Sequence, residues 1–293
     1  MKIDLHAHST ASDGTESPAD LVRAAADAGL DVVALTDHDT TAGWAPALAA
    51  ARDLRIGLVP GMEISCRSRE GISVHVLAYL HDPTHPGLLE EIGKARKARL
   101  TRAERMVELL AEDFPITWAD VTAQTAHEAT VGRPHIADAL VAAGVVSDRT
   151  EAFSNILTSH SRYYVTHYAP DPAHAVELVK EAGGAAVFAH PVASGRGRVV
   201  GEDVFHQMID AGLDGVEVDH RDNPAEGRAW LRRLAAERGL LMTGSSDYHG
   251  TGKPNRLGEN MTAAAVLERI LQIGTGAPAY LPSTAGGQSP AGR

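Results

Sequence analysis

The hydrophobic positions in the first 80 residues of this chain follow two alternating patterns. Short continuous apolar runs, rich in β-branched residues, predict buried strands. They lie at residues 2–5, 32–36, 56–60 and 73–80. Apolar residues at helical spacing predict helices at 18–29 and 45–52, and Ser17 and Pro18 fit the N-cap and the first turn of the earlier one. This part of the chain therefore reads as strand–helix units.

From about residue 86 to 158 the pattern becomes helical throughout. The segment LLEEIGKARKARLTRAERMVELLAE carries apolar residues at helical spacing with charged residues between them. Residues 118–125 and 134–143 predict further short helices, and no strand pattern intervenes. We expect residues 85–164 to form a helical insertion.

After residue 171 the alternation of helices and strands resumes. The predicted helices are 172–182, 204–211, 224–238 and a last amphipathic one at 263–273. The predicted strands are 185–189, 215–218 and 240–243. Repeated units in a chain of 293 residues favour a closed or nearly closed (β/α) barrel over a doubly wound sheet, although periodicity alone leaves both open.

The expected organisation is therefore a barrel with one interruption. Residues 1–84 form its first part, the insertion at 85–164 lies over the C-terminal rim, and residues 165–282 form its second part. The last segment, 283–293, is small and polar, and we expect it to be disordered.

Composition limits the partners of such a barrel. A formal charge of -11 argues against broad electrostatic capture of long duplex nucleic acid or of an anionic membrane, so any phosphate must be gripped locally. The single cysteine, Cys66, excludes an internal disulfide and is expected to be a buried, unreactive thiol. The sequence shows no membrane-spanning segment and no secretory signal, which predicts a cytoplasmic protein, with a monomer favoured.

Nine side chains capable of binding metal stand at predicted strand ends or within a strand. They are His6, His8, Asp13, His38, Glu63, His75, His190, Asp247 and His249. In a barrel, the loops after the carboxyl ends of the strands build the functional site, so these groups should converge. Imidazoles and carboxylates without thiolate suit Zn²⁺, Mn²⁺ or Fe²⁺.

Two features of the spacing strengthen the metal interpretation. His6 and His8 are separated by one residue at a strand end, so both side chains point to the same face. His75 lies inside a strand pattern and must point inward to reach the other groups. The other histidines read as ordinary core or surface residues. These are His81, His85, His127, His160, His167, His174 and His206.

Five ordered motifs, HAHSTASDG, LTDHD, GMEIS with a following strand histidine, AHP and SSDYH, resemble those of the PHP (polymerase and histidinol phosphatase) family of metal-dependent phosphoesterases. The resemblance covers residues 1–82 and 165–260 and implies an α/β fold, a distorted seven-stranded (β/α) barrel of PHP type. It also implies a three-metal site. One ion would take His6, His8, Glu63 and Asp247; the second would share Glu63 and add His75 and His190; the third would take Asp13, His38 and His249.

Within the family, Asp13 and the helical insertion are similar to the branch that contains nucleoside 3',5'-bisphosphate phosphatases and 5'-to-3' exoribonucleases. Histidinol phosphatases usually carry a histidine at the position of Asp13, which makes histidinol phosphate the less favoured substrate. Hydrolysis of a nucleotide's phosphate ester, by a hydroxide held between two of the two or three divalent ions, is the expected activity. Glu63, Asp247 and His190 are the expected catalytic residues, with Asp247 handling the proton of the nucleophile.

Substrate contacts must come from groups beyond the metal ligands. Arg133 and His135 stand at a predicted helix start, where guanidinium and backbone N–H groups can bind a second phosphate. Further candidates are Arg196, Arg198, His220 and Asn255, each against the alternative of an ordinary surface or structural residue. The expected partner is a phosphorylated small molecule or a short oligonucleotide.

Two other classes of function compete with this one. A PHP module that binds metal without turnover would serve as a structural or regulatory domain, but the complete ligand set argues against it. An amidohydrolase reaction would be expected to use a mononuclear or carbamylated-lysine site, and no lysine occupies a strand-end motif here.

Overall fold

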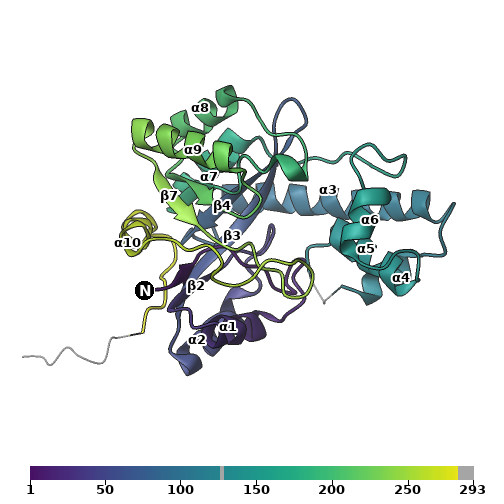
Figure 1. Ribbon diagram of the computed structural model, residues 1–293, viewed down its shortest axis with the longest axis horizontal. Coiled ribbons are helices and arrows are strands. Elements are labelled where there is room, and N and C mark those ends of the chain that lie inside the picture. The colour runs from purple at the N-terminus through teal and green to yellow at the C-terminus, as the bar shows by residue number, and fades with distance from the viewer. Residues whose placement is uncertain (126–128, 283–293) are drawn as a thin grey trace, which may run out of the picture.

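A seven-stranded sheet curls into a nearly closed barrel at the centre of the molecule (Figure 1). The computed structural model describes residues 1–125 and 129–282, so His127 and the tail expected at 283–293 lie outside the described residues. Each strand pairs with the next one along the chain. The strands are β1 (Ile3–Asp4), β2 (Val32–Leu35), β3 (Gly57–Arg67), β4 (Ser73–Tyr79), β5 (Ala185–Phe188), β6 (Gly215–Asp219) and β7 (Leu241–Gly244). An isolated bridge between Ala7 and Tyr248 joins the two edges just beyond β1 and β7.

In the part of the chain that the structure describes, six helices surround this barrel. They are α1 (Pro18–Asp27), α2 (Trp44–Leu54), α7 (Pro172–Glu181), α8 (Glu202–Asp210), α9 (Ala225–Arg238) and α10 (Ala264–Ile273). In Figure 1, α1 and α2 lie on one side of the barrel and α7, α8 and α9 on the opposite side. The Ser17 side chain caps α1 by accepting a hydrogen bond from the N–H of Asp20, with Pro18 in the first turn. The predicted barrel, its α/β class and this helix start are confirmed.

The strand β4 runs antiparallel to both of its neighbours, β3 and β5, whereas the other pairs are parallel. The reason is the short turn between Arg67 and Ser73, because a parallel return requires a crossover of a dozen or more residues. The sequence interpretation ended the third strand at residue 60 and placed Glu63 in the following loop. That boundary is wrong, because β3 continues to Arg67 in its hairpin with β4.

Both faces of the barrel strands are buried, which explains their continuous apolar runs. Val32 and Ala34 point into the barrel interior, where they join a cluster with Ile3 and Leu77. The residues between them, such as Val33, pack outward in a cluster that also contains α1 and α2. A strand buried on both faces has no polar alternation, so the sequence locates it but does not tell its two faces apart.

Four helices follow β4 and form a lobe beside the barrel (Figure 1). They are α3 (Pro86–Leu110), α4 (Trp118–Ala123), α5 (Arg133–Ala142) and α6 (Arg149–Asn155). The first part of α3 packs against the barrel cluster through Leu88 and Ile92. Its last turns join α4, α5 and α6 in a separate apolar cluster that includes Met106 and Leu140. Within the described residues, no helix has the length and apolar character that a bilayer span requires.

The lobe's own core predicts how it responds to truncation. Leu140→Ala should lower the free energy of unfolding by about 2–5 kcal/mol, because the fully buried side chain leaves a cavity. Leu100→Ala on α3, where the leucine is 39% exposed, should change it by no more than about 0.5 kcal/mol. Urea denaturation followed by tryptophan fluorescence measures both. Equal losses in the two variants would contradict a packed core in the lobe.

Candidate metal centre

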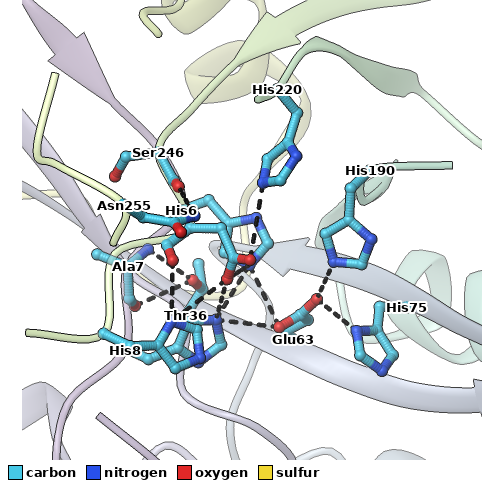
Figure 2. A network of polar contacts seen from close by, with 12 residues as sticks. His6, Ala7, His8, Thr36, Glu63, His75, His190, His220, Ser246 and Asn255 are labelled. Carbon is cyan, nitrogen blue, oxygen red and sulfur yellow. Dashed lines mark hydrogen bonds and ion pairs between the residues drawn. The ribbon is translucent and has the colours of Figure 1, made fainter. Parts of the chain in front are cut away.

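The nine predicted ligands meet at one rim of the barrel, and Figure 2 shows five of them, His6, His8, Glu63, His75 and His190. His6 and His8 follow β1, His190 follows β5, and Asp247 and His249 follow β7. Asp13 and His38 stand on the loops after β1 and β2. His75 is the third residue of β4, and because β4 is antiparallel its amino end lies at this rim. The antiparallel direction of β4 therefore brings His75 to the site. No unusual side-chain orientation is needed.

The carboxylate of Glu63, on β3, lies at the centre of the cluster. Its Oε2 atom is 3.0 to 3.3 Å from three imidazole nitrogens, those of His8, His6 and His38. Its Oε1 atom lies 2.8 Å from Nδ1 of His75 and 3.1 Å from Nε2 of His190, as Figure 2 shows. Two oxygens of one residue thus reach five imidazoles, which is the arrangement of a ligand shared between ions.

Two further carboxylates, those of Asp247 and Asp13, belong to the cluster. The Oδ1 atom of Asp247 is 3.5 Å from His6 Nε2 and 3.4 Å from His8 Nε2. The Oδ1 atom of Asp13 is 3.3 Å from His249 Nε2. The ligand atoms form three sets, and within each set all of them lie within 4.8 Å of one another. They are His6, His8, Glu63 and Asp247; His38, Glu63 and His75; and His8, Asp13, His38 and His249.

The donor atoms fit divalent ions. Nδ1 of His8, Nδ1 of His38 and Nε2 of His249 are buried without a hydrogen-bond partner in the described structure. An unpartnered buried nitrogen costs free energy, and coordination to a cation removes that cost. Only imidazole nitrogens and carboxylate oxygens form the sets, which suits Zn²⁺, Mn²⁺ or Fe²⁺.

The protonation of most ligands favours metal binding. Burial lowers the pKa of His38, and it lowers that of His190 to about 3 and that of His249 to about 4, with nearby cations adding to the effect. Burial opposes charge on Asp13 and Glu63, but the surrounding imidazoles outweigh it and hold the pKa of both carboxyls well below the usual range. Neutral imidazoles and ionised carboxylates are the forms that coordinate metal.

His6 and His8 differ from the other imidazoles. Burial again opposes their charged forms, but the carboxylates of Glu63 and Asp247 outweigh it, with Glu217 contributing at His6. The pKa of His6 rises well above its ordinary value, and that of His8 rises to about 9. An ion that binds these two imidazoles must therefore displace their protons.

Three motif residues at this rim have left-handed backbone conformations. They are Asp39 with φ of 53°, His190 with φ of 32° and Asp247 with φ of 56°. Such values are uncommon for residues other than glycine and cost on the order of 1–3 kcal/mol each. The surrounding hydrogen bonds hold them in place, for example the bond from Ser65 N–H to Asp39 Oδ1 at 2.8 Å. These backbone conformations direct His190, which follows β5, and Asp247, which follows β7, toward the cluster.

A second layer of buried carboxylates orients the ligands. Glu217 on β6 has one oxygen 3.0 Å from Nδ1 of His6, and its other oxygen accepts the N–H of His190 at 2.8 Å. Asp4 accepts hydrogen bonds from the N–H groups of Ser246 and Gly258 and so fixes the loop that carries Asp247. The sequence interpretation missed both acids, although an acidic residue inside a buried strand is itself a signal of a specific role.

Cationic groups gather on the outer oxygen of Asp247. Its Oδ2 atom lies 2.6 Å from Arg196 Nη2 and 3.1 Å from Lys253 Nζ. His220 Nε2 is 3.6 Å away, buried and without a hydrogen-bond partner in the described structure. Arg196 and His220 were predicted from the sequence, whereas Lys253 was missed because a lone lysine in a loop has the pattern of an ordinary surface residue.

The other predicted substrate residues lie elsewhere. Arg198 donates to the carbonyl of Glu70 in the β3–β4 turn. Asn255 donates to the carbonyl of Ser246, 2.6 Å away, and so supports the Asp247 loop. Neither contact reaches a metal ligand.

Arg133 and His135 do not share one anion site. Nδ1 of His135 accepts the N–H of Gly132, and burial lowers the pKa of this ring against the opposing charge of Asp13. The Arg133 guanidinium instead lies over the ring of Tyr164 and donates to the carbonyl of Leu157. Residues two apart on a helix point in nearly opposite directions, which accounts for the separation.

Cys66, on β3, is buried as expected, and burial raises the pKa of its thiol well above the ordinary value. His81 is also a core residue. It is packed against Trp44, and burial lowers its pKa to about 4.

Comparison with known proteins identifies relatives of this chain. A model of the PHP domain family matches residues 4–185. The chain is 35% identical over 263 residues to a 5'-3' exoribonuclease of Haemophilus influenzae, which covers 89% of this chain and 94% of the relative. It is 33% identical over 261 residues to a 3',5'-nucleoside bisphosphate phosphatase of Chromobacterium violaceum, with 87% and 89% covered. A solved structure from Bifidobacterium adolescentis, to which a metal-dependent phosphoesterase activity has been ascribed, is 46% identical with a TM-score of 0.91 and covers 93% of this chain and 96% of that one.

The role of Glu217 can be tested by Glu217→Gln. We expect the affinity for Mn²⁺ or Zn²⁺ to fall about 10- to 100-fold, because the amide no longer holds a negative charge against His6. Glu226→Gln, an exposed change in the first turn of α9, is the matched control and should leave the affinity unchanged. Calorimetric titration of the metal-free proteins measures both. Equal affinities would show that Glu217 plays no part in orienting His6.

Proposed function

The chain belongs to the PHP domain family, and from this premise we propose that it hydrolyses a phosphate ester of a nucleotide, either a nucleoside 3',5'-bisphosphate or a 5'-phosphorylated short RNA. The family and the relatives make it a metal-dependent hydrolase of phosphoric esters. The observation that carries the proposal is the Glu63-centred cluster of imidazoles and carboxylates, with cationic side chains beside it on Asp247.

The clustered donors support a site for two or three ions, with Mn²⁺, Zn²⁺ and Fe²⁺ as candidates. Glu63 and Asp247, with His6 and His8, would hold the first ion. His75 and His190, which share Oε1 of Glu63, would hold the second, and Asp13, His38 and His249 the third. Bound there, such ions supply Lewis acidity and water of lowered pKa at neutral pH.

Arg196 and Lys253 are the residues that would grip the phosphate to be cleaved. Both contact Oδ2 of Asp247, the oxygen that faces away from His6 and His8. The Arg196 guanidinium is held at Nε by Asp222 and at Nη2 by Asp247, which leaves Nη1 for the phosphate oxygens. Two cations on fixed supports stabilise the charge that develops on those oxygens in the transition state.

His220 would place a hydrogen-bond donor beside the same oxygens. The N–H of Asp222 donates to Nδ1 of His220 at 3.1 Å, so in the neutral ring the proton resides on Nε2. That Nε2 lies 3.6 Å from Oδ2 of Asp247. The ring can thus donate a proton or a hydrogen bond to the departing oxygen, while the Asp247 carboxylate orients the attacking group.

The relatives favour nucleotide substrates. One is named a 3',5'-nucleoside bisphosphate phosphatase and another a 5'-3' exoribonuclease, and both align over more than four fifths of this chain. Asp13, which approaches His249, agrees with that branch. We therefore place terminal phosphates of nucleotides and short RNA ahead of histidinol phosphate.

Metal removal and a substrate panel test this proposal. The wild-type protein should lose its phosphatase activity in EDTA and regain it with Mn²⁺, and Glu63→Ala should lose both bound metal and turnover. Among adenosine 3',5'-bisphosphate, 5'-phosphorylated trinucleotide RNA and histidinol phosphate, we expect the highest kcat/KM for one of the first two. Elemental analysis and phosphate release measure the outcome. A protein that binds Mn²⁺ yet hydrolyses none of the three substrates would refute the proposal.

The phosphate-gripping role of Arg196 and Lys253 has its own test. Arg196→Gln and Lys253→Gln should each reduce kcat/KM about 10- to 100-fold, because each removes one charge-assisted hydrogen bond to the phosphate. Metal content should stay unchanged, since neither residue is a ligand. Arg198→Gln is the control, because Arg198 contacts the carbonyl of Glu70 instead. Full kcat/KM in both variants would rule out the assigned role.

A further inference from the structure

The helical lobe is hydrogen-bonded to the loop that carries Asp13. In the lobe, the N–H of Thr130 donates to the carbonyl of Ala11 at 3.2 Å. The ring of His135, on α5, makes a hydrogen bond to the backbone of the next loop residue. Arg149, the first residue of α6, donates from Nη1 to the carbonyl of Asp13 at 3.0 Å. Three consecutive residues of the loop are therefore held from the lobe.

A second lobe residue fixes the guanidinium of Arg149. Its Nε and Nη2 atoms donate to the two carboxylate oxygens of Asp138, on α5, each at 2.6 Å. We call Arg149 and Asp138 the clamp. Their side chains are only 14% and 25% exposed, so the pair is firmer than an ion pair at the surface. The forked contact balances the charge of the guanidinium and leaves Nη1 for the carbonyl of Asp13.

The clamp leaves the carboxylate of Asp13 available to an ion. Arg149 contacts the main-chain oxygen of Asp13, whereas the carboxylate oxygens face imidazoles. Oδ1 is 3.3 Å from Nε2 of His249, and Oδ2 is 3.9 Å from Nε2 of His38. An arginine paired with the carboxylate itself would compete with a cation for the same oxygens. Here the guanidinium fixes the backbone of a ligand and does not occupy its donor atoms.

The clamp also touches the loop that follows His249. A side chain at Gly252 would collide with Nη1 of Arg149, so the bare backbone of glycine makes room for the guanidinium. The two loops are joined to each other, because the N–H of Thr15 donates to the carbonyl of His249 at 3.1 Å. Asp13 and His249 are both ligands proposed for the third ion. One guanidinium from the lobe thus lies against both loops that supply them.

The ligands proposed for the first two ions are supported from the barrel. Glu217 on β6 contacts the ring of His6 and accepts the N–H of His190. Arg196, which follows β5, contacts the carboxylate of Asp247. These supports do not involve the clamp. Loss of the clamp should therefore act on the third set of ligands first.

Hydrogen bonds, more than side-chain packing, fix the loop against this part of the lobe. Among the described residues, a cavity of about 400 Å³ lies beside the clamp. Its lining includes Thr10 and Thr15 from the loop and Gln124, Val141 and Arg149 from the lobe. Atoms that border a cavity lack partners for dispersion contacts on that side. The position of the loop relative to the lobe therefore depends on the polar contacts that cross between them.

We propose that Arg149 is a positioning residue of the metal centre. Through the backbone of Asp13, it makes the affinity of the third set of ligands for an ion depend on the docking of the helical lobe. The inference rests on the metal centre of the proposed function and adds a link between the lobe and the occupancy of one site. Such a link is reciprocal, so an ion bound there also stabilises the docked lobe.

Titration of the metal-free protein with Mn²⁺ tests the clamp. In Arg149→Gln the affinity for one ion should fall about 10- to 100-fold, and the affinities for the other ions should stay those of the wild type. Asp138→Asn loosens the guanidinium without removing it, so it should weaken the same binding step, and it serves if Arg149→Gln does not fold. Calorimetry and the electron paramagnetic resonance signal of free Mn²⁺ measure the affinities.

The control for this titration is Arg162→Gln. Arg162 is an exposed arginine of the lobe that pairs with Asp113, away from the clamp, and its loss should leave every affinity unchanged. Unchanged binding of all ions in both clamp variants would overturn the inference. Equal weakening at every binding step would also overturn it, because it would indicate a general loosening of the protein.

A double-mutant cycle shows whether Arg149 acts through Asp13. Asp13→Ala should weaken the same Mn²⁺ step, and the addition of Arg149→Gln should then cause little further loss, because no ligand remains for the clamp to position. Additive losses would overturn the inference, since they would mean that Arg149 supports only the fold of the lobe.

Kinetics separate this inference from the proposed function. In Arg149→Gln, the Mn²⁺ concentration for half-maximal hydrolysis of adenosine 3',5'-bisphosphate should rise about 10- to 100-fold, and saturating Mn²⁺ should restore most of the lost turnover. Low turnover at every Mn²⁺ concentration, with an unchanged half-maximal concentration, would overturn the positioning role. If the protein bound Mn²⁺ but hydrolysed no phosphate ester, the titration would still decide the clamp, and only the proposed function would fail.

Discussion

The structure of this rim depends on one buried carboxylate. Glu63 has its two oxygens within 3.3 Å of five imidazoles that come from four different parts of the chain. Burial of any one of those imidazoles alone costs free energy. The negative charge of Glu63 offsets that cost for all five, because it faces each of them. The carboxylate can do this because β3 continues past the barrel wall into its hairpin with β4. A strand that stopped at residue 60 would leave the histidines without a common partner.

Sequence patterns located most of the barrel and the residues of its rim. Apolar runs mark strands, and histidines and acids that follow such runs gather wherever parallel strands end together. The direction of β4 was not predicted, because an apolar run does not reveal which way a strand points. Glu217 was missed because its partner His6 is distant in sequence, and Lys253 because a lone loop lysine has the pattern of a surface residue. Arg67, Arg102 and Arg133 could not be grouped either, since only the path of α3 brings them together.

The charge of the molecule is distributed in a way that suits small anionic substrates. An overall negative surface does not attract long polyanions, while two local groups of cations lie beside the metal centre. One consists of Arg196 and Lys253 on Asp247, and the other of Arg67, Arg99, Arg102 and Arg133 where the lobe meets the barrel. The first has a protein carboxylate as its partner, whereas in the second, among the described residues, only Arg99 approaches one, Asp39 at 3.5 Å. Substrate selectivity in such a protein depends on the positions of its cationic side chains, and the net charge contributes little to it.

The antiparallel direction of β4 also bears on the shape of the lobe. Because β4 runs away from the metal rim, the chain leaves it at the far end of the barrel and must return before the lobe can reach the metal centre. The helix α3, at 25 residues, makes this return over about 37 Å, and Arg99 and Arg102 lie in its second half, close to the rim. This helix therefore acts as a molecular ruler. Two extra turns, seven residues, would keep its facing side in register and move the lobe outward by about 10 Å. The length of this single helix therefore sets the space between the lobe and the metal centre.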